Sequence, residues 1–529
     1  MLLGDEAIAL AGMDAGMSGI YAYPGTPSTE IMEYVQHSGR SSEDNIFCQW
    51  SANEKTAFEA ALGMSYSGKR SMACMKHVGL NVAADPFMNA AITGVNGGFL
   101  LVVADDPSMH SSQNEQDSRY YGKFAMIPVL EPVNQQEAYD MVFYGFDLSE
   151  KYKLPVMIRI TTRLAHSRSA VRTASRLSQK EVNLPSDPVQ YVLLPGIARK
   201  RYRGLLNSQT LLEGESGNSP WNSLVNGNDK SVGYIACGLA HNYLIEAYRG
   251  KQHANPVLKI GQYPLPAELV EKITGDCEKV LVLEEGYPIV EEMLRGFPGT
   301  GKKIMGRLDG TLPRDGELNP DIVAEALGMP FEKGPEIPSV VKNRPPSFCA
   351  GCGHIDMFNA LLESIRNYGP GRVFSDIGCY TLGALPPFNA INSCVDMGAS
   401  VTMAKGAADA GLHPSVCVIG DSTFTHSGIT GLLDAVNDGS SITVLIGDNS
   451  TTGMTGGQKS SATGRIEDIC AGVGVDPGHI KVINPLRKHH EENTRIISRE
   501  LEYRGVSVVI ARRECIQVTM RRKKEEKTS

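Results

Sequence analysis

Two hydrophobic periods alternate along residues 1–175 of this 529-residue chain. Apolar residues recur at helical spacing over 5–15 and 53–67, and short β-rich runs lie at 20–23 and 99–103. Helices that alternate with strands are typical of a parallel sheet covered on both faces. We therefore expect residues 1–175 to form a doubly wound α/β domain.

The regular pattern stops between residues 176 and 230, where serine, asparagine, glycine and proline are dense. Such a composition favours turns, so we expect 176–230 to be a linker or a set of surface loops. A second α/β pattern follows over 231–331, with β-like runs at 232–236, 256–260 and 279–283. Helix-length stretches separate these runs, which predicts a second α/β domain.

A charged, proline-containing stretch precedes a third α/β pattern, which we place at 340–529. Its strand signals lie at 416–419 and 441–446, with a helical pattern at 428–436 between them. The length of the chain also favours several domains, because one hydrophobic core rarely grows beyond about 250–300 residues. The predicted fold class is therefore α/β, with three doubly wound domains.

Composition narrows the class of protein. Hydrophobic residues make up 42% and charged residues 21%, which is ordinary for a globular chain, and the formal net charge is −8. This acidic balance argues against nucleic acid as the main partner. The first residues lack the features of a signal peptide, and no apolar run approaches the roughly 20 residues of a membrane helix. We expect a cytoplasmic protein that does not bind a membrane.

The eleven cysteines are not expected to form disulfides, because the cytoplasm keeps thiols reduced. Cys349 and Cys352 form a Cys-x-x-Cys in a glycine-bearing loop, a spacing that serves zinc, a redox dithiol or another metal centre. Cys379 and Cys515 are candidates for a third and a fourth ligand, although spacing alone favours a packing role for both. The remaining seven are expected to be packing residues: Cys48, Cys74, Cys237, Cys277, Cys394, Cys417 and Cys470.

Two predicted strands of the third segment each end in a polar turn. One ends just before Asp421, and the next ends just before Asn449. Open α/β sheets bind ligands at the carboxyl ends of their strands, and Mg²⁺ takes hard oxygen ligands. The Asp421 carboxylate, the Asn449 amide oxygen and a backbone carbonyl near Thr451 are therefore candidate magnesium ligands.

The same turns contain glycines, such as Gly420 and Gly453, that let a backbone approach phosphate groups closely. A Gly-Asp turn by itself usually means only a turn. With an asparagine at this spacing it resembles the thiamine-diphosphate motif, in which Gly-Asp-Gly is followed by Asn, and Ser422 stands where that motif has its second glycine. The candidate cofactor-binding residues are Gly420, Asp421, Ser422, Asn449, Thr451 and Gly453.

Longer motifs resemble one family, the thiamine-binding alpha subunit of indolepyruvate:ferredoxin oxidoreductase. The resemblance covers nearly the whole chain in the same order. It implies a pyrimidine-binding domain at 1–175 and a diphosphate-binding domain at 340–529, with a transketolase C-terminal-like domain at 231–331 between them. The segments that carry it are 22–28 (AYPGTPS), 75–86 (MKHVGLNVAADP), 104–117, 349–352 (CAGC), 378–383 (GCYTLG) and 420–428 (GDSTFTHSG).

The resemblance also implies cofactors and a reaction. In the wider group of 2-oxoacid:ferredoxin oxidoreductases a 4Fe–4S cluster is held by a Cys-x-x-Cys and two later cysteines. The order of Cys349, Cys352, Cys379 and Cys515 is similar. The implied cofactors are thiamine diphosphate, Mg²⁺ and one such cluster, with coenzyme A as co-substrate. The implied reaction is oxidative decarboxylation of a 2-oxoacid, such as indolepyruvate or another arylpyruvate, to acyl-CoA and CO₂, with electrons passing through the cluster to ferredoxin.

Catalytic residues of the first segment follow from the same resemblance. Glu54 matches the family glutamate that hydrogen-bonds N1′ of the cofactor's aminopyrimidine, and we expect its carboxyl group to be desolvated. Glu59 is the less favoured alternative, because a solvated helix face explains a glutamate at that position. Thr26 matches a family threonine that contacts substrate, and it fits just as well as an N-cap before Pro27. Three residues of a predicted polar loop after a strand are further candidates for the substrate pocket: Lys76, His77 and Asn81.

The resemblance is incomplete beyond Cys515. Family alpha subunits usually continue into a ferredoxin-like domain with two more clusters, whereas this sequence ends at Ser529 in a charged tail. We therefore expect ferredoxin or a separate iron–sulfur subunit to take the electrons directly. A smaller beta subunit of the gamma type is also implied, in an α₂β₂ hetero-oligomer.

Other functions fit parts of the pattern. A non-oxidative thiamine-dependent 2-oxoacid decarboxylase would share both cofactor domains but would not need four ordered cysteines. A related ferredoxin oxidoreductase would act on a different 2-oxoacid. A catalytically silent scaffold subunit would be expected to lack Glu54, Asp421 or Asn449, all of which are present. The sequence favours the oxidative enzyme.

Overall fold

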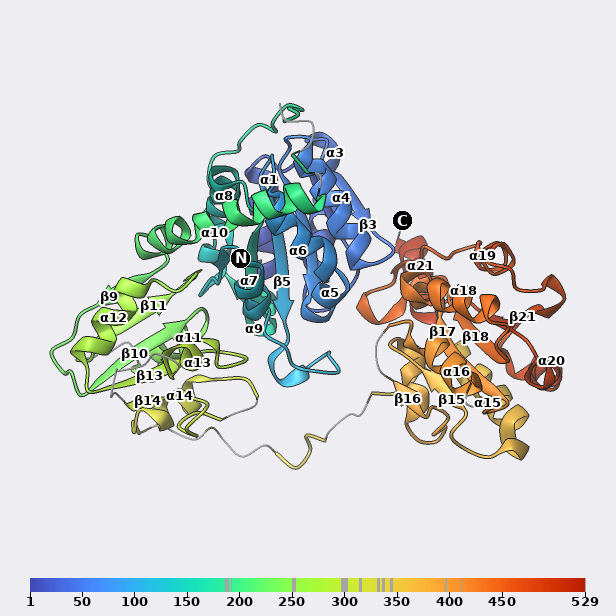
Figure 1. The fold of residues 1–529 in the computed structure, drawn as a ribbon. Helices are drawn as coiled ribbons and strands as arrows, with labels where there is room; N and C mark the ends of the chain where they lie inside the picture. The colour runs from blue at the N-terminus through green and yellow to red at the C-terminus, as the bar shows by residue number, and fades with distance from the viewer. Residues whose placement is uncertain are drawn as a thin grey trace. The chain divides into compact units, whose positions relative to one another are not determined.

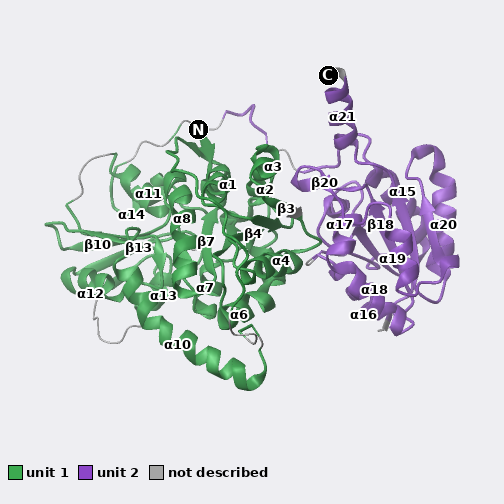
Figure 2. Cartoon of the chain, turned by 90° about the horizontal axis from the view of Figure 1, so that it is seen from above, with its two compact units in different colours: residues 1–336 green, residues 337–529 purple. Residues whose placement is uncertain are grey.

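Largely parallel sheets flanked by helices form most of the computed structural model (Figure 1). The chain divides into two units, which are residues 1–336 (unit 1) and residues 337–529 (unit 2) (Figure 2). Unit 1 contains two of the large sheets and unit 2 contains the third. The structure describes residues 1–528 except 186–189, 192, 250–253, 296–302, 314–315, 331–333, 335–337, 343–345, 395–396 and 410.

The first sheet of unit 1 has seven strands in the order β12-β6-β7-β5-β4-β2-β3. All neighbouring pairs are parallel except β12 with β6. The strands are β2 (Gly19–Ala22), β3 (Phe47–Trp50), β4 (Ser71–Lys76), β5 (Phe99–Asp105), β6 (Val129–Leu130), β7 (Val156–Thr161) and β12 (Gln262–Tyr263). A small antiparallel pair, β1 (Leu2–Leu3) with β8 (Arg168–Ser169), lies beside it.

Helices cover both faces of this sheet, as the alternating pattern predicts. Successive residues of β4 and β5 belong to two different apolar clusters, because side chains alternate between the faces of a strand. One face packs against α4 (Glu54–Tyr66), α5 (His77–Val82) and α6 (Ala84–Thr93). The other face packs against α1 (Gly4–Asp14), α2 (Thr29–His37), α8 (Gln135–Tyr152) and α9 (Thr162–His166). Two shorter helices are α3 (Arg40–Glu43) and α7 (Arg119–Ala125).

The second sheet of unit 1 has five strands in the order β14-β13-β10-β11-β9. They are β9 (Ser223–Val225), β10 (Val232–Cys237), β11 (Val257–Ile260), β13 (Lys279–Leu283) and β14 (Lys303–Met305), and β9 alone runs antiparallel to its neighbour. The flanking helices are α11 (Ala240–Ala247), α12 (Ala267–Asp276), α13 (Ile289–Arg295) and α14 (Pro320–Ala326).

The two sheets of unit 1 share one apolar core. One cluster contains Leu101 of β5 together with Val282 of β13, so it continues from the first sheet to the second. Strand β12, from the second α/β pattern, also pairs with β6 of the first. The segments 1–175 and 231–331 therefore form two sheets but a single compact unit.

The expectation that 176–230 is only linker or surface loops is wrong for part of that segment. Helix α10 (Pro195–Gly217) occupies its middle, and β9 follows at 223–225. Leu205 and Leu212 lie seven positions apart on α10, are buried, and pack into the core that the two sheets share. Four glycines in the helix conceal this apolar stripe in the sequence, and packing against the core stabilises the helix despite their low propensity.

Unit 2 contains an all-parallel sheet of six strands in the order β16-β15-β17-β18-β22-β21. The strands are β15 (Val373–Ser375), β16 (Ser393–Cys394), β17 (Ser415–Gly420), β18 (Ile442–Asp448), β21 (Ile480–Ile483) and β22 (Ser507–Arg512). One face packs against α16 (Ala399–Asp409), α18 (Ile429–Asn437) and α19 (Ile466–Gly472), and the other against α15 (Gly353–Ile365) and α20 (His490–Glu502). The charged tail is helical, as α21 (Ile516–Thr528).

Most of the cysteines expected to be packing residues are in the core. Five of them are buried: Cys74, Cys237, Cys277, Cys417 and Cys470. The expectation is wrong for Cys394, which is exposed because β16 is the edge strand of its sheet, and Cys48 is half-buried. Among the residues that the structure describes, no helix combines the length and the apolar character that crossing a membrane requires.

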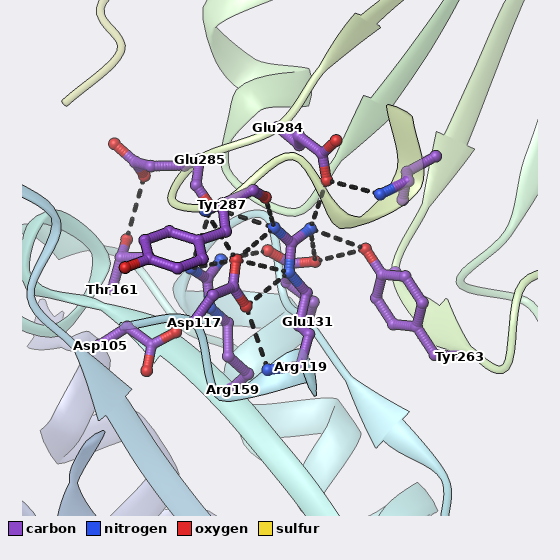
Figure 3. Close-up of polar contacts among 12 residues, drawn as sticks. Asp105, Asp117, Arg119, Glu131, Arg159, Thr161, Tyr263, Glu284, Glu285 and Tyr287 are labelled. Carbon is purple, nitrogen blue, oxygen red and sulfur yellow. Dashed lines mark hydrogen bonds and ion pairs between the residues drawn. The ribbon is translucent and has the colours of Figure 1, made fainter. Parts of the chain in front are cut away.

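A buried ionic network joins the two sheets of unit 1 (Figure 3). Arg159 on β7 contacts Asp105 at 2.8 Å and Glu131 at 2.5 Å. Arg119 on α7 lies 3.1 Å from Glu284, which follows β13 of the five-stranded sheet. Both arginines are 1% exposed, so their charges must be compensated inside the protein.

Carboxyl groups outnumber the two guanidinium groups in this network. Burial raises the pKa of Glu284 to about 7 and does the same to the pKa of Glu285. These two carboxyls therefore keep protons to a pH at which solvated carboxyls have lost theirs. The carboxyl groups are those of Asp105, Asp117, Glu131, Glu284 and Glu285.

The Glu284→Gln variant is expected to become more stable relative to the natural chain as the pH rises from 5 to 8. The unfolded carboxyl loses its proton above its usual pKa of 4.5, whereas the folded one keeps it to about 7, so the natural chain loses stability over this interval. The loss approaches about 3 kcal/mol, and neutral glutamine avoids it. Denaturant unfolding at both pH values measures the difference. The exposed Glu268→Gln is the control, and an equal pH dependence in all three chains would contradict the argument.

Candidate functional site

Glu54 is the first residue of α4, and Asn53 caps the helix. Glu54 is 4% exposed and lies against α5, since a Cβ at Gly79 would be 2.6 Å from Glu54 Oε1. Glu59, later in the same helix, is exposed and forms an ion pair with Lys55. The structure thus separates the two candidates: Glu54 is desolvated, and Glu59 lies on the solvated face of the helix.

The carboxyl ends of β2 and β4 bring Thr26 and Lys76 close to one loop. Lys76 Nζ donates a hydrogen bond of 3.1 Å to the backbone oxygen of Ser111, and Ser111 Oγ donates one of 3.1 Å to the backbone oxygen of Thr26. Burial lowers the pKa of Lys76, and the negative charges of Asp106 and Glu54 oppose that shift. An ammonium group, a buried carboxylate and a threonine therefore gather at one edge of the sheet.

Thr26 does not cap a helix. Helix α2 begins at Thr29, the capping position is Ser28, and Pro27 precedes both. The Thr29 hydroxyl accepts a hydrogen bond of 3.0 Å from the backbone nitrogen of Gly25. Residues 25–28 therefore form a turn where the sequence predicted the start of the helix. The prediction that Thr26 is an N-cap is therefore wrong. The structure instead shows Thr26 beside Ser111.

His77 and Asn81 lie on helix α5, not in the polar loop that the sequence suggests. His77 is buried, and its Nε2 is 3.2 Å from the backbone oxygen of Asn114. Asn81 is exposed, and its Oδ1 accepts a hydrogen bond of 2.6 Å from the Tyr121 hydroxyl. Both residues thus contact the segment that follows β5.

The sequence analysis does not identify Asp106 and Ser111, whose hydrogen bonds hold the segment after β5 in its conformation. Asp106 Oδ2 accepts hydrogen bonds from the backbone nitrogen of Ser111 at 2.8 Å and from Ser112 Oγ at 2.6 Å. The signal is the pair Asp105-Asp106 directly after an apolar strand, the same pattern that singles out Asp421 in unit 2.

In unit 2, Asp421 directly follows β17 and is 2% exposed. Its Oδ2 is buried and has no hydrogen-bond partner among the described residues. Burial raises the pKa of Asp421 to about 7, the Ser460 side chain opposes the shift, and the charge of Asp448 adds to it. A buried carboxylate oxygen without a partner is costly unless a cation or a proton binds it, so this position fits a metal ligand.

The loop after β18 lies beside Asp421. Gly420 and Gly447 are register partners on neighbouring strands, and Ser422 Oγ lies 2.9 Å from Thr452 Oγ1 of the loop. The Asn449 amide oxygen accepts a hydrogen bond of 3.1 Å from the backbone nitrogen of Thr451, which leaves its second lone pair for another ligand. A short hairpin of β19 (Thr451–Thr452) and β20 (Gln458–Lys459) closes the loop.

Four cysteines of unit 2 line one cavity of about 90 Å³. We call Cys349, Cys352, Cys379 and Cys515 the thiol cage. Burial raises the pKa of Cys379 to about 12, and the charges of the other three thiols add to that effect. Four neighbouring thiolates can coexist there only with a cationic centre that compensates their charge.

The thiol cage packs against the loop after β18, residues 449–459, which we call the diphosphate loop because the sequence predicts that it approaches a diphosphate. Asp448, Asn449 and Gly453 line the same cavity as the four cysteines. A Cβ at Gly453 would be 3.0 Å from Cys379 Sγ, so the absence of a side chain lets the loop lie directly on the cage.

The sequence analysis also does not identify His354, which lies between the thiol cage and strand β18. Its Nδ1 is 3.3 Å from Cys352 Sγ, and burial lowers its pKa to about 4, so the ring is neutral. A Cβ at Gly447 would be 2.9 Å from His354 Nε2, so only glycine leaves room for the ring. The available signal is a histidine two residues after Cys352, at the start of α15.

Two family models match the chain, one in each unit. "Pyruvate flavodoxin/ferredoxin oxidoreductase, thiamine diP-bdg" matches residues 11–197, which include Glu54. "Thiamine pyrophosphate enzyme, C-terminal TPP binding domain" matches residues 376–509, which include Asp421 and Asn449. Both models describe domains that bind thiamine diphosphate.

Relatives are similar over almost the full chain. The chain is 41% identical to the indolepyruvate oxidoreductase subunit IorA of Archaeoglobus fulgidus, over 99% of this chain and 88% of that protein. It is 38% identical to the subunit of the same name from Methanothermobacter thermautotrophicus, over 97% of this chain and 86% of that protein. The chain belongs to the IorA family of indolepyruvate oxidoreductase subunits.

Membership of the IorA family makes this chain a subunit of a thiamine-diphosphate-dependent 2-oxoacid oxidoreductase. The family resemblance and the α/β fold class predicted from the sequence are confirmed. The fold also resembles a solved 2-oxoglutarate:ferredoxin oxidoreductase from Magnetococcus marinus, with a TM-score of 0.50 and 18% identity over 62% of this chain and 64% of that one.

In this member of the IorA family, Asp421→Ala is expected to weaken the binding of Mg²⁺ and of thiamine diphosphate together. Even the loss of an outer partner of a metal ligand costs about 10–100-fold in affinity, so the loss of a ligand should cost at least that much. Calorimetric titration with the cofactor, at fixed Mg²⁺, measures the change. Asp434→Ala, an exposed aspartate on α18 of the same unit, is the control. Unchanged cofactor affinity in Asp421→Ala would refute the assignment.

Proposed function

We propose that this chain catalyses the oxidative decarboxylation of an arylpyruvate such as indolepyruvate, with coenzyme A as acyl acceptor and ferredoxin as electron acceptor. One 2-oxoacid and one coenzyme A yield one acyl-CoA, one CO₂, one proton and two electrons. A 4Fe–4S cluster held by the thiol cage would carry these electrons, one at a time, to two ferredoxins. The names of the relatives support an arylpyruvate as substrate.

The observation that carries this proposal is the cavity that the thiol cage shares with Asn449 and Gly453 of the diphosphate loop. A non-oxidative decarboxylase returns its electrons to the product as a C–H bond and needs no electron acceptor beside its cofactor. Four thiols that share a cavity with the diphosphate loop therefore support an oxidative enzyme.

In unit 2 the proposed metal ligands are Asp421, Asn449 and the backbone carbonyl near Thr451. Gly420, Ser422 and Gly453 lie where the backbone can approach the diphosphate. The thiol cage holds the cluster through one cysteine sulfur for each iron. Thiamine diphosphate, when bound, supplies the electron sink for decarboxylation.

In unit 1 the proposed catalytic residue is Glu54, whose desolvated carboxyl shares a proton with N1′ of the aminopyrimidine. Lys76 offers an ammonium group for the substrate carboxylate, and its contact with the Ser111 loop positions it beside Thr26. His77 and Asn81 line the same end of the sheet and are proposed to shape the substrate pocket.

The proposed assembly contains a smaller beta subunit of the gamma type, in an α₂β₂ hetero-oligomer in the cytoplasm. Ferredoxin or a separate iron–sulfur subunit accepts the electrons. The naming of both relatives as subunits of an oxidoreductase supports a partner chain.

The test is the rate of coenzyme A-dependent ferredoxin reduction by the complex of this chain with its beta subunit, prepared without oxygen. Indolepyruvate and phenylpyruvate are expected to show a higher kcat/KM than pyruvate, 2-oxoglutarate or branched 2-oxoacids. A higher kcat/KM for a small aliphatic acid would overturn the substrate assignment. Aldehyde formed without reduction of ferredoxin would instead favour the non-oxidative decarboxylase.

A further inference from the structure

Three helices of unit 1 bring a second group of metal-type ligands together, apart from the thiol cage. Asp5 lies near the start of α1, Glu30 near the start of α2, and His166 at the end of α9. One carboxylate oxygen of each acid and one imidazole nitrogen all lie within 4.8 Å of one another. Among the residues that the structure describes, these three form the group of His, Cys, Asp or Glu side chains whose ligand atoms lie this close together.

Asp5 is the unusual member of this group. It is 0% exposed, and no N–H or hydroxyl donor among the residues that the structure describes reaches either of its carboxylate oxygens. One oxygen of Glu30, Oε2, is also buried without such a partner. A buried carboxylate is normally compensated by donors or by an opposite charge, and Asp5 instead faces the carboxylate of Glu30. Two carboxyl groups aimed at one point repel each other when both are ionised, so either a shared proton or a cation must lie between them.

The surrounding charge is also negative. Glu6 acts electrostatically on Asp5, and Asp106 acts on His166. The basic side chain nearest in sequence, Arg168, lies 3.4 Å from Glu6 and so serves a different carboxylate. Glu30 and His166 are each about one-third exposed, with Glu30 Oε1 at 3.6 Å from His166 Nε2, so an ion can enter from solvent and reach Asp5 behind them.

We propose that Asp5, Glu30 and His166 bind a divalent transition-metal ion. Two carboxylates balance the charge of a divalent ion, and three ligands leave positions for water. The imidazole nitrogen sets the class of ion, because nitrogen ligands suit ions such as Fe²⁺ and Zn²⁺, whereas Mg²⁺ prefers oxygen ligands and retains its waters. The ion cross-links α1, α2 and α9 beside the carboxyl ends of β2 and β7, so its binding stabilises that end of unit 1.

The test is the titration of the full chain with Mn²⁺ in the absence of thiamine diphosphate, with free Mn²⁺ followed by its electron paramagnetic resonance signal. Mn²⁺ is the probe because it binds oxygen and nitrogen ligands and has little affinity for the thiol cage. The Asp421→Asn background removes the magnesium site proposed for unit 2. One Mn²⁺ should remain bound in that background. Asp5→Asn and His166→Gln, each added to it, should weaken its binding at least about 10-fold.

His490→Gln is the matched control, because His490 also lies against a glutamate, Glu363 at 2.6 Å, but has no second carboxylate in its group. It should leave Mn²⁺ binding unchanged. Mn²⁺ should also raise the thermal midpoint of the Asp421→Asn chain but not that of the chain with Asp5→Asn added. His166 lies at a helix end and is partly exposed, so His166→Gln tests the site even where Asp5→Asn alters folding.

Equal Mn²⁺ binding in the chains with and without His166→Gln would overturn the site. Displacement of the bound Mn²⁺ by an equal concentration of Mg²⁺ would overturn the assignment to a transition metal. Neither outcome depends on the activity proposed above, because the readout is the ion itself.

Discussion

Replacing Glu54 by glutamine should lower the rate of 2-oxoacid turnover by about 10²–10⁴-fold while thiamine diphosphate remains bound. Glutamine keeps the size of the side chain but cannot share a proton with N1′ of the aminopyrimidine. Because Glu54 is 4% exposed at the start of α4, water cannot replace its carboxyl efficiently. The direct measurement is hydrogen–deuterium exchange at C2 of the bound cofactor, which should slow by the same factor.

The matched control is Glu59→Gln. Glu59 lies in the same helix but on its exposed face, where it pairs with Lys55, and a surface ion pair of this kind is worth little. Glu59→Gln should therefore leave both exchange and turnover almost unchanged. If the two substitutions have equal effects, Glu54 is not the partner of N1′. If Glu54→Gln prevents cofactor binding, its role is structural.

Replacing Cys379 by serine should abolish ferredoxin reduction and lower the iron content from about four per chain. Serine has nearly the same volume but is a poor ligand for iron. Cys379 touches Gly453 of the diphosphate loop, so its loss removes the thiolate next to the cofactor's binding loop. Release of CO₂ in the absence of an electron acceptor should persist, because Glu54 and Asp421 are intact. Iron analysis and the visible spectrum of protein purified without oxygen measure the first effect.

Cys394→Ser is the control for this experiment. Cys394 is an exposed cysteine of the same unit and does not line the cavity of the thiol cage. It should keep both iron and ferredoxin reduction. Zinc in place of iron in the natural chain, or full iron content in Cys379→Ser, would show that the thiol cage does not hold the proposed cluster.

The positions of the candidate residues could be predicted where they depend on strand ends. Asp421 and Asn449 both follow apolar strands, and the carboxyl ends of parallel strands meet at one edge of a sheet. The candidate cluster ligands could also be predicted, because their order along the chain resembles that of the cluster cysteines in 2-oxoacid:ferredoxin oxidoreductases. They are Cys349, Cys352, Cys379 and Cys515. Spacing alone could not assign Cys379 and Cys515 to a metal site, because two cysteines that are distant in sequence are compatible with packing roles.

Other features depend on contacts that no local pattern contains. Helix α10 crosses a segment rich in glycine and serine because Leu205 and Leu212 pack into a core built from distant strands. Thr26 is not an N-cap because the backbone nitrogen of Gly25 donates a hydrogen bond to the Thr29 hydroxyl and helix α2 begins only at Thr29. In each case a tertiary or turn contact stabilises the observed structure by more than the intrinsic conformational preference of the residues opposes it.

The sequence by itself determined the α/β class, the strand ends that carry Asp421 and Asn449, and the family, because these depend on residues close together in the chain or on their order. Tertiary structure decided which side chains meet. It packed Gly453 on Cys379 and His354 on Gly447, it joined two predicted domains through β12 and a shared core, and it aimed Asp5 at Glu30 and His166. Such contacts link residues separated by long stretches of chain, and only the packing of whole helices and sheets determines their distances.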